Sequence, residues 1–268
     1  MLQDLNYAIL LERFGPEGVP HFRTISRRRL DALRRRQDHI YASAAMLLPM
    51  SRWLRDHLVA GGVPIERLRV VNPGSTAVPA VGAPVMPRRA GIERKLLFVG
   101  RDFDTKGGPQ VVAAFARLRQ QLGAQIRLTV AGPDVWPLRG DIPDGVTFLG
   151  KVPHPRVGEL MDEADLLVMP SLMEGFGIVF AEALSRGLPC IGRDACAMPE
   201  IIDPVSGGRL VTSNSVDELA SLIHDTLEDD HLYAACAQAA DQQRGHYTWS
   251  RAGREVVAAV GKVLTTAT

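Results

Sequence analysis

Short apolar segments alternate with longer amphipathic segments along the centre of the chain, starting near residue 95. The short apolar segments predict strands at 95–99, 126–131, 146–149, 165–169 and 188–191. Helices are predicted between them at 108–122, 155–164 and 178–186. Short apolar strands that alternate with helices indicate right-handed βαβ units and a parallel sheet with helices on both faces. The predicted fold class is therefore α/β, with a Rossmann-like parallel sheet.

The two ends of the chain differ from this central region. After Val211 the pattern predicts helices at 215–228, 230–245 and 250–264. Before residue 76 the predicted elements are a helix at 24–38, a strand at 40–49, a helix at 52–60 capped by Ser51, and a strand at 68–71. The stretch 76–87 is rich in Ala, Val and Pro, which favours an extended linker. We therefore predict a partial N-terminal α/β domain with its linker at 1–88, a Rossmann-like domain at 89–248 and a C-terminal helix at 249–268.

Composition excludes several classes of protein. The net charge of +1 argues against a nucleic-acid partner, and 268 residues suffice for two domains. Cys190, Cys196 and Cys236 form no metal-binding spacing, so we expect reduced thiols in a cytoplasmic protein. No apolar run approaches the roughly 20 residues that span a bilayer, and the first residues do not resemble a secretory signal.

The predicted helix at 24–38 is rich in arginine. Its cationic positions are Arg27, Arg28, Arg29, Arg34, Arg35 and Arg36. A basic amphipathic helix can lie on an anionic membrane surface, so Arg23–Arg36 is a candidate for peripheral contact with the inner face of a membrane. An ordinary solvated or partner-facing surface would give the same pattern. Nucleic-acid binding is poorly supported because no aromatic residues are interleaved with the arginines.

Ligands of a doubly wound sheet bind beyond the carboxyl ends of its strands, and the first such end carries two cations. Gly100 ends the strand, Arg101 and Lys106 follow, and Gly107-Gly108 precede a helix. Cations beside a helix N-terminus suit a diphosphate, although an ordinary loop with two surface cations remains an alternative. The loop matches neither the P-loop pattern nor G-x-G-x-x-G, so nicotinamide binding has no support.

Two further strand ends carry candidate residues. Gly132 lies in a turn after the second strand, where a plain turn is the alternative. Glu174 lies in a turn with Gly175 and Gly177, glycines that permit backbone conformations closed to other residues. The amides of Phe176–Ile178 would then be free to bind an anion or sugar hydroxyls. Glu182, eight positions after Glu174, could accept two hydrogen bonds from a ribose. The alternative is a Glu174 that caps the helix and a Glu182 that faces solvent.

These motifs resemble a known family. The pattern E-G-F-G-x-x-x-x-E-A-x-x-x-G-x-P occupies 174–189, and G-R-x-x-x-x-K-G occupies 100–107. A weaker G-x-x-P-E pattern is partly kept at Ala197–Glu200. Over roughly 92–250 the chain is similar to the C-terminal domain of retaining GT-B glycosyltransferases of family 4, the group 1 glycosyl transferases. A looser match at 24–75 resembles the end of their N-terminal domain.

The resemblance implies a metal-independent transfer from a nucleotide-diphosphate sugar, with retention of anomeric configuration and without a cofactor. Arg101 and Lys106 would stabilise the diphosphate as leaving group, and Glu174 would hold the donor sugar, so these three are the candidate catalytic residues. Glu182 would hold the ribose, and the backbone at Val152 would meet the base. The implied donor-binding set is Gly100, Arg101, Lys106, Gly132, Val152, Glu174, Gly175, Phe176, Gly177, Ile178 and Glu182.

The N-terminal part departs from the family, whose N-terminal domain is a Rossmann-like unit of roughly 150–200 residues. The resemblance therefore implies a GT-B-like fold with a truncated N-terminal domain, and an acceptor, lipid-linked or saccharide, that meets a reduced surface. A second copy or a partner subunit would complete the acceptor-binding surface. Otherwise the small N-terminal part suffices for acceptor binding by itself. A non-catalytic sugar-nucleotide-binding subunit is the alternative function. A GT-B-type epimerase is weaker, because no matching acid–base cluster is evident.

Overall fold

The computed structural model describes residues 2–3, 6–9, 11–12, 26–85, 93–202 and 206–266. The chain divides into two compact units. The first comprises Met1–Pro73 with Ser250–Thr268, and the second comprises Gly74–Trp249. The predicted boundary between residues 88 and 89 lies outside the described residues and stays a prediction.

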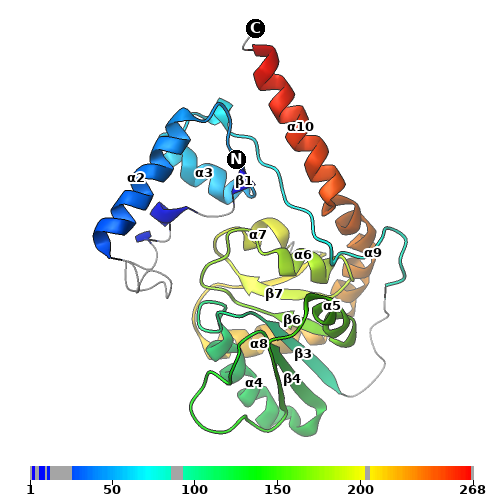
Figure 1. Cartoon of the computed structure of the whole chain (residues 1–268). Helices are drawn as coiled ribbons and strands as arrows, with labels where there is room; N and C mark the ends of the chain where they lie inside the picture. The colour runs from blue at the N-terminus through cyan, green and yellow to red at the C-terminus, as the bar shows by residue number, and fades with distance from the viewer. Residues whose placement is uncertain are drawn as a thin grey trace. The chain divides into compact units, whose positions relative to one another are not determined.

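The second unit is built on a six-stranded parallel sheet with the order β5-β4-β3-β6-β7-β8 (Figure 1). The strands are β3 Arg94–Val99, β4 Ile126–Ala131, β5 Val146–Gly150, β6 Leu166–Val168, β7 Cys190–Arg193 and β8 Gly208–Val211. Leu96 of β3 is in register with Leu128 of β4 and with Leu166 of β6. The strand order reverses between β3 and β6, which is where doubly wound sheets bind ligands. The predicted α/β class and parallel sheet are confirmed.

Helices cover both faces of this sheet. They are α4 Gly108–Leu122, α5 His154–Glu163, α6 Ile178–Leu184, α7 Met198–Ile201, α8 Val216–Leu227 and α9 Asp230–His246, with the short 3-10 helix η3 Gly123–Gln125. α4 packs on α8, whereas α5 packs on α6 and α6 on α9. The β3–β4 crossover and the β5–β6 crossover run in opposite directions across the sheet, so right-handed connections place α4 and α5 on opposite faces. The side chains of Leu96–Phe98 and Leu166–Val168 are accordingly all buried.

The first unit is smaller and mainly helical. Its elements are β1 Leu2–Gln3, α2 Arg27–Ser43, β2 Leu48–Pro49, α3 Arg52–Ala60, the 3-10 helix η2 Ile65–Arg67 and α10 Trp249–Thr266, whose first residue belongs to the second unit. The Ser51 hydroxyl accepts the N–H of Leu54 and so caps α3 as predicted. Residues from both ends of the chain form one buried cluster, in which Leu48 and Val71 lie with Ala252 and Ala259 of α10.

Two strand predictions in the first unit are wrong over most of their length, although β2 ends at Pro49 as predicted. The predicted strand at 40–49 begins inside α2, because the helix continues to Ser43 and buries Tyr41 as well as Leu30. The predicted strand at 68–71 is reduced to one bridge between Leu47 and Leu68. Part of the predicted helix at 24–38, residues 24 and 25, lies outside the described residues.

Candidate functional site

Two strand ends of the sheet meet through a pair of glycines. Gly100 follows β3, and its N–H donates to the carbonyl of Ala131 at 2.9 Å. Gly132 follows β4 with a φ of 126°, and a Cβ placed there would lie 2.5 Å from the carbonyl carbon of Gly100. A Cβ on Gly100 would lie 2.8 Å from Cγ of Lys106. Both positions therefore require glycine because another backbone or side chain fills the space.

Lys106 and Glu174, which follow different strands, form an ion pair. Nζ of Lys106 lies 2.6 Å from Oε2 of Glu174, and the two side chains are 24% and 14% exposed. Ser171 joins the loops that carry them, because its hydroxyl contacts the carbonyls of Thr105 at 3.2 Å and Met173 at 2.8 Å. The alternative of a helix-capping Glu174 is wrong, because the N-cap of α6 is Gly177 and the Glu174 carboxylate accepts a hydrogen bond from Lys106 instead.

The turn before α6 presents backbone amides. Gly177 has a φ of 91°, in the left-handed region, and a Cβ there would lie 3.0 Å from Cγ of Glu174. Gly175 is not among the described glycines with positive φ, so only Gly177 of the two adopts this left-handed conformation. Within the described residues the N–H groups of Phe176–Ile178 have no hydrogen-bond acceptor. The Phe176 ring is buried against Tyr247, so its backbone faces the turn while its side chain packs in the interior.

Glu182 is a buried carboxylate, 3% exposed on α6. The alternative of a solvent-facing Glu182 is therefore wrong. Its Oε1 accepts a hydrogen bond from the hydroxyl of Ser75 at 2.5 Å and lies 3.4 Å from Nε2 of His154. The sequence reasoning missed Ser75 and His154, because neither belongs to a local motif and Ser75 is 107 positions from Glu182.

A cavity of about 300 Å³ lies at the carboxyl ends of β3, β4 and β5. It is lined by Val99, Gly100, Arg101, Gly132, Lys151, Val152, His154 and Val157. Arg101 and Lys151 are exposed, and neither side chain has a partner among the described residues. The structure thus brings Gly100, Arg101, Gly132 and Val152 to one cavity, and His154 connects that cavity to Glu182.

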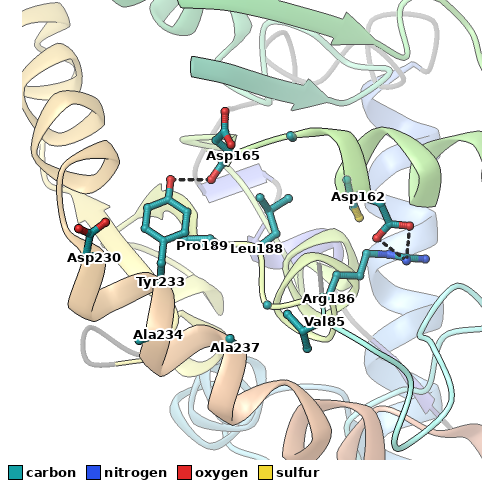
Figure 2. Close-up of a pocket in the computed structure, with 13 residues that line it drawn as sticks. Val85, Asp162, Asp165, Arg186, Leu188, Pro189, Asp230, Tyr233, Ala234 and Ala237 are labelled. Atoms are coloured by element: carbon teal, nitrogen blue, oxygen red, sulfur yellow. Dashed lines mark hydrogen bonds and ion pairs between the residues drawn. The ribbon is translucent and has the colours of Figure 1, made fainter. Parts of the chain in front are cut away.

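A larger cavity, of about 470 Å³, lies at the opposite edge of the sheet, where β6 and β7 begin. Figure 2 shows its lining, in which Arg186 forms an ion pair with Asp162 and the Tyr233 hydroxyl reaches Asp165. None of the predicted site residues lines it. The candidate site is therefore the smaller cavity together with the Lys106–Glu174 pair and Glu182, all on the carboxyl side.

Neither a metal centre nor a membrane-spanning helix is found among the described residues. They contain no group of three or more His, Cys, Asp or Glu side chains arranged to hold a metal ion. No described helix combines the length and apolar character that crossing a bilayer requires.

The sequence matches the family model for glycosyl transferases group 1 over residues 87–243. The chain belongs to this family. Among curated proteins it is 28% identical over 233 residues to the amylovoran biosynthesis glycosyltransferase AmsK of Erwinia amylovora, an alignment that covers 76% of this chain and 53% of AmsK. The chain therefore spans about half the length of the curated relatives it matches.

Solved structures support the fold. Sucrose-phosphate synthase from Thermosynechococcus elongatus superimposes with a TM-score of 0.72 at 21% identity, covering 92% of this chain and 66% of that one. Anabaena HepE, solved in complex with UDP and glucose, gives a TM-score of 0.69 at 18% identity, with 85% and 66% covered. The predicted GT-B-like fold is confirmed by these neighbours.

Proposed function

We propose that this protein is a retaining, metal-independent glycosyltransferase of family 4 that moves a sugar from a nucleotide-diphosphate sugar to an acceptor. The observation that carries the proposal is the gathering of two cations, Arg101 and Lys106, and two carboxylates, Glu174 and Glu182, at one edge of a GT-B sheet. HepE, a structural neighbour, was solved with UDP and glucose, which supports a sugar nucleotide as the donor.

In this proposal, Arg101 and Lys106 stabilise the diphosphate as it leaves. Arg101 lines the cavity without a protein partner in the described residues, so its guanidinium is free for phosphate oxygens. Lys106 donates one N–H to Glu174, and an ammonium has three N–H donors, so two remain for the donor. Two fixed cations can stabilise developing phosphate charge without a metal ion.

The two carboxylates recognise the sugars of the donor. Glu174 lies beside the unpaired amides of Phe176–Ile178, so this turn offers an acceptor and several donors to the transferred sugar. Glu182 lies near the cavity edge, where its carboxylate can accept hydrogen bonds from the ribose diol. The base then lies near the backbone of Val152.

The proposal is tested by turnover of purified protein with UDP-, GDP- and ADP-sugars in the presence of EDTA. Glu174→Gln should reduce sugar transfer or donor hydrolysis about 10²–10³-fold, because it removes the charge beside the reacting sugar. Glu159→Gln, on an exposed face of α5, is the matched control and should leave the rate unchanged. NMR of the product should show the donor's anomeric configuration. Equal rates for wild type and Glu174→Gln, or inversion, would contradict the proposal.

A non-catalytic sugar-nucleotide-binding subunit is the second candidate, because the same cavity and charged side chains would bind the donor without any transfer. In that case a partner subunit or a second copy would supply the acceptor side. Calorimetry that detects binding of a sugar nucleotide, without turnover towards water or any saccharide acceptor, would favour this candidate.

We propose further that the protein is cytoplasmic and that α2 makes a peripheral membrane contact, which would suit a lipid-linked acceptor. Its six arginines are exposed in the structure, whereas Arg23 lies outside the described residues. The fraction of protein that sediments with vesicles should increase with anionic lipid content. Each arginine near the surface should contribute about 1 kcal/mol to the free energy of membrane binding. Binding that ignores lipid charge would remove this part of the proposal.

A further inference from the structure

Ser75 is connected to the proposed ribose carboxylate by a short hydrogen bond. Its hydroxyl donates to Oε1 of Glu182 at 2.5 Å, within the range of charge-assisted bonds between a hydroxyl and a carboxylate. Glu182 is 3% exposed, so protein groups rather than bulk water set its orientation. Ser75 follows the end of the first compact unit by two positions and lies outside every motif in the sequence.

The hydroxyl of Ser75 is oriented by a second hydrogen bond. It accepts the N–H of Ala77 at 3.0 Å, which leaves its own hydrogen for Glu182. His154 approaches the same carboxylate oxygen, Oε1, with Nε2 at 3.4 Å. Within the described residues Oε2 of Glu182 has no side-chain partner, so one oxygen is held by the protein and the other is available to a ligand.

The backbone that carries Ser75 is itself fixed. The N–H of Ser75 donates to the carbonyl of Tyr247 at 3.0 Å. A Cβ on Gly74 would lie 2.2 Å from the backbone nitrogen of Trp249, so this segment lies directly against 247–249. The ring of Tyr247 in turn packs on Phe176, with centroids 5.9 Å apart, in the turn beside Glu174. The Ser75 hydroxyl therefore has a defined position from which to hold the carboxylate.

We infer that Ser75 is a positioning residue for nucleotide binding. It holds Glu182 in the orientation that accepts the ribose diol, so the segment that follows the first unit takes part in donor recognition. The inference rests on the proposed function. Without the hydroxyl, Glu182 must be ordered by the ligand itself, and binding becomes weaker.

Isothermal calorimetry with UDP, GDP and ADP provides the test, using the diphosphate that wild type binds best. Ser75→Ala should weaken binding about five- to tenfold, the loss expected for one hydrogen bond. Ser75→Thr keeps a hydroxyl and should restore most of the affinity. Thr76→Ala is the matched control, because Thr76 is exposed and its side chain makes no hydrogen bond with the described residues.

The 2′,3′-dideoxy analogue of the same diphosphate separates positioning from general damage. It lacks the diol that Glu182 would accept, so Ser75→Ala should change its affinity less than about twofold. Equal weakening for the nucleotide and its dideoxy analogue, or no weakening of either, would overturn the inference while leaving the proposed function intact. If wild type binds none of the three diphosphates, the proposed function fails first, and the inference fails with it.

Discussion

The two edges of the sheet differ in how their charged groups are satisfied. At the amino edge, around the larger cavity, Arg186 bonds both carboxylate oxygens of Asp162 at 2.9 and 3.0 Å (Figure 2). Asp165 there accepts the backbone N–H of Lys95 at 2.7 Å. At the carboxyl edge, Arg101 and Lys151 line a smaller cavity and have no partner among the described residues.

This difference shows that volume alone does not identify a binding site. The amino-edge cavity is larger, about 470 against 300 Å³, but the arginine that lines it, Arg186, is ion-paired with Asp162. A cavity that binds an anionic donor needs cations that are not already paired with a protein carboxylate. By that criterion the carboxyl edge is the stronger candidate for the binding site.

The largest expected effect comes from removing the cation that follows β3, and the matched control removes the cation near the start of the same strand. Lys106→Met, after β3, should lower sugar transfer about 10²–10³-fold, because the leaving diphosphate loses a positioned charge. Lys95→Met, near the start of β3, should leave the rate within about twofold, since Lys95 lies at the amino edge and pairs with Glu93. Initial rates at saturating donor give the comparison.

A further variant extends this test to the larger cavity. Asp162→Ala breaks the ion pair with Arg186 and should leave the rate and the affinity for nucleotide diphosphate unchanged. A fall in activity with Asp162→Ala or Lys95→Met as great as with Lys106→Met would contradict the assignment of the carboxyl edge as the site.

A smaller effect is expected where two strand ends touch. Gly132→Ala should lower the free energy of unfolding by about 2–4 kcal/mol, because the added Cβ combines an unfavourable φ with a clash against the backbone of Gly100. Gly140→Ala, also at positive φ but with nothing within 4 Å, should lower it by about 1 kcal/mol. Urea unfolding measures both. An equal loss of unfolding free energy in the two variants would mean that the close approach of Gly132 to Gly100 does not affect stability.

Local signals account for the parts of the fold that could be predicted from the sequence. α4 was predicted with its observed bounds, because Gly107 and Gly123 mark its two ends. Contacts between segments that are distant in the sequence have no comparable local signal, so they could not be predicted. The bond between Ser75 and Glu182 spans 107 positions, and His154 stands in no motif. The end of α2 was misplaced because Tyr41, within an apolar run, belongs to the buried face of the helix rather than to a strand.

The smallest expected effect concerns Glu218, a carboxylate at the carboxyl edge whose two oxygens both accept hydrogen bonds from the protein. Glu218 of α8 accepts hydrogen bonds from Ser213 and Thr212, which follow β8, and these bonds lower its pKa to about 2, the hydroxyl of Ser213 contributing most. Glu218→Gln should therefore lower the free energy of unfolding at pH 7, by about 0.5–1 kcal/mol after allowance for solvent screening.

The pH dependence of this effect has a definite sign. The pKa of Glu218 is lower in the folded chain than its usual value of 4.5, so the stabilisation is complete above pH 4.5 and is lost as the pH falls through about 2. In thermal unfolding, the difference in stability between wild type and Glu218→Gln should therefore decrease as the pH is lowered from 4.5 to about 2. Glu66→Gln, on an exposed side chain without a partner in the described residues, should change the free energy by less than about 0.5 kcal/mol.

Nucleotide binding completes the comparison, because Glu218 lies at the same edge of the sheet as Glu182. Its hydrogen-bonding capacity is taken by the protein, whereas Glu182 keeps one oxygen without a side-chain partner in the described residues. Glu218→Gln should thus leave the affinity for nucleotide diphosphate within about twofold. A marked loss of affinity would contradict this comparison. It would mean that a carboxylate at the carboxyl edge contributes to donor binding even when its oxygens are hydrogen-bonded by the protein.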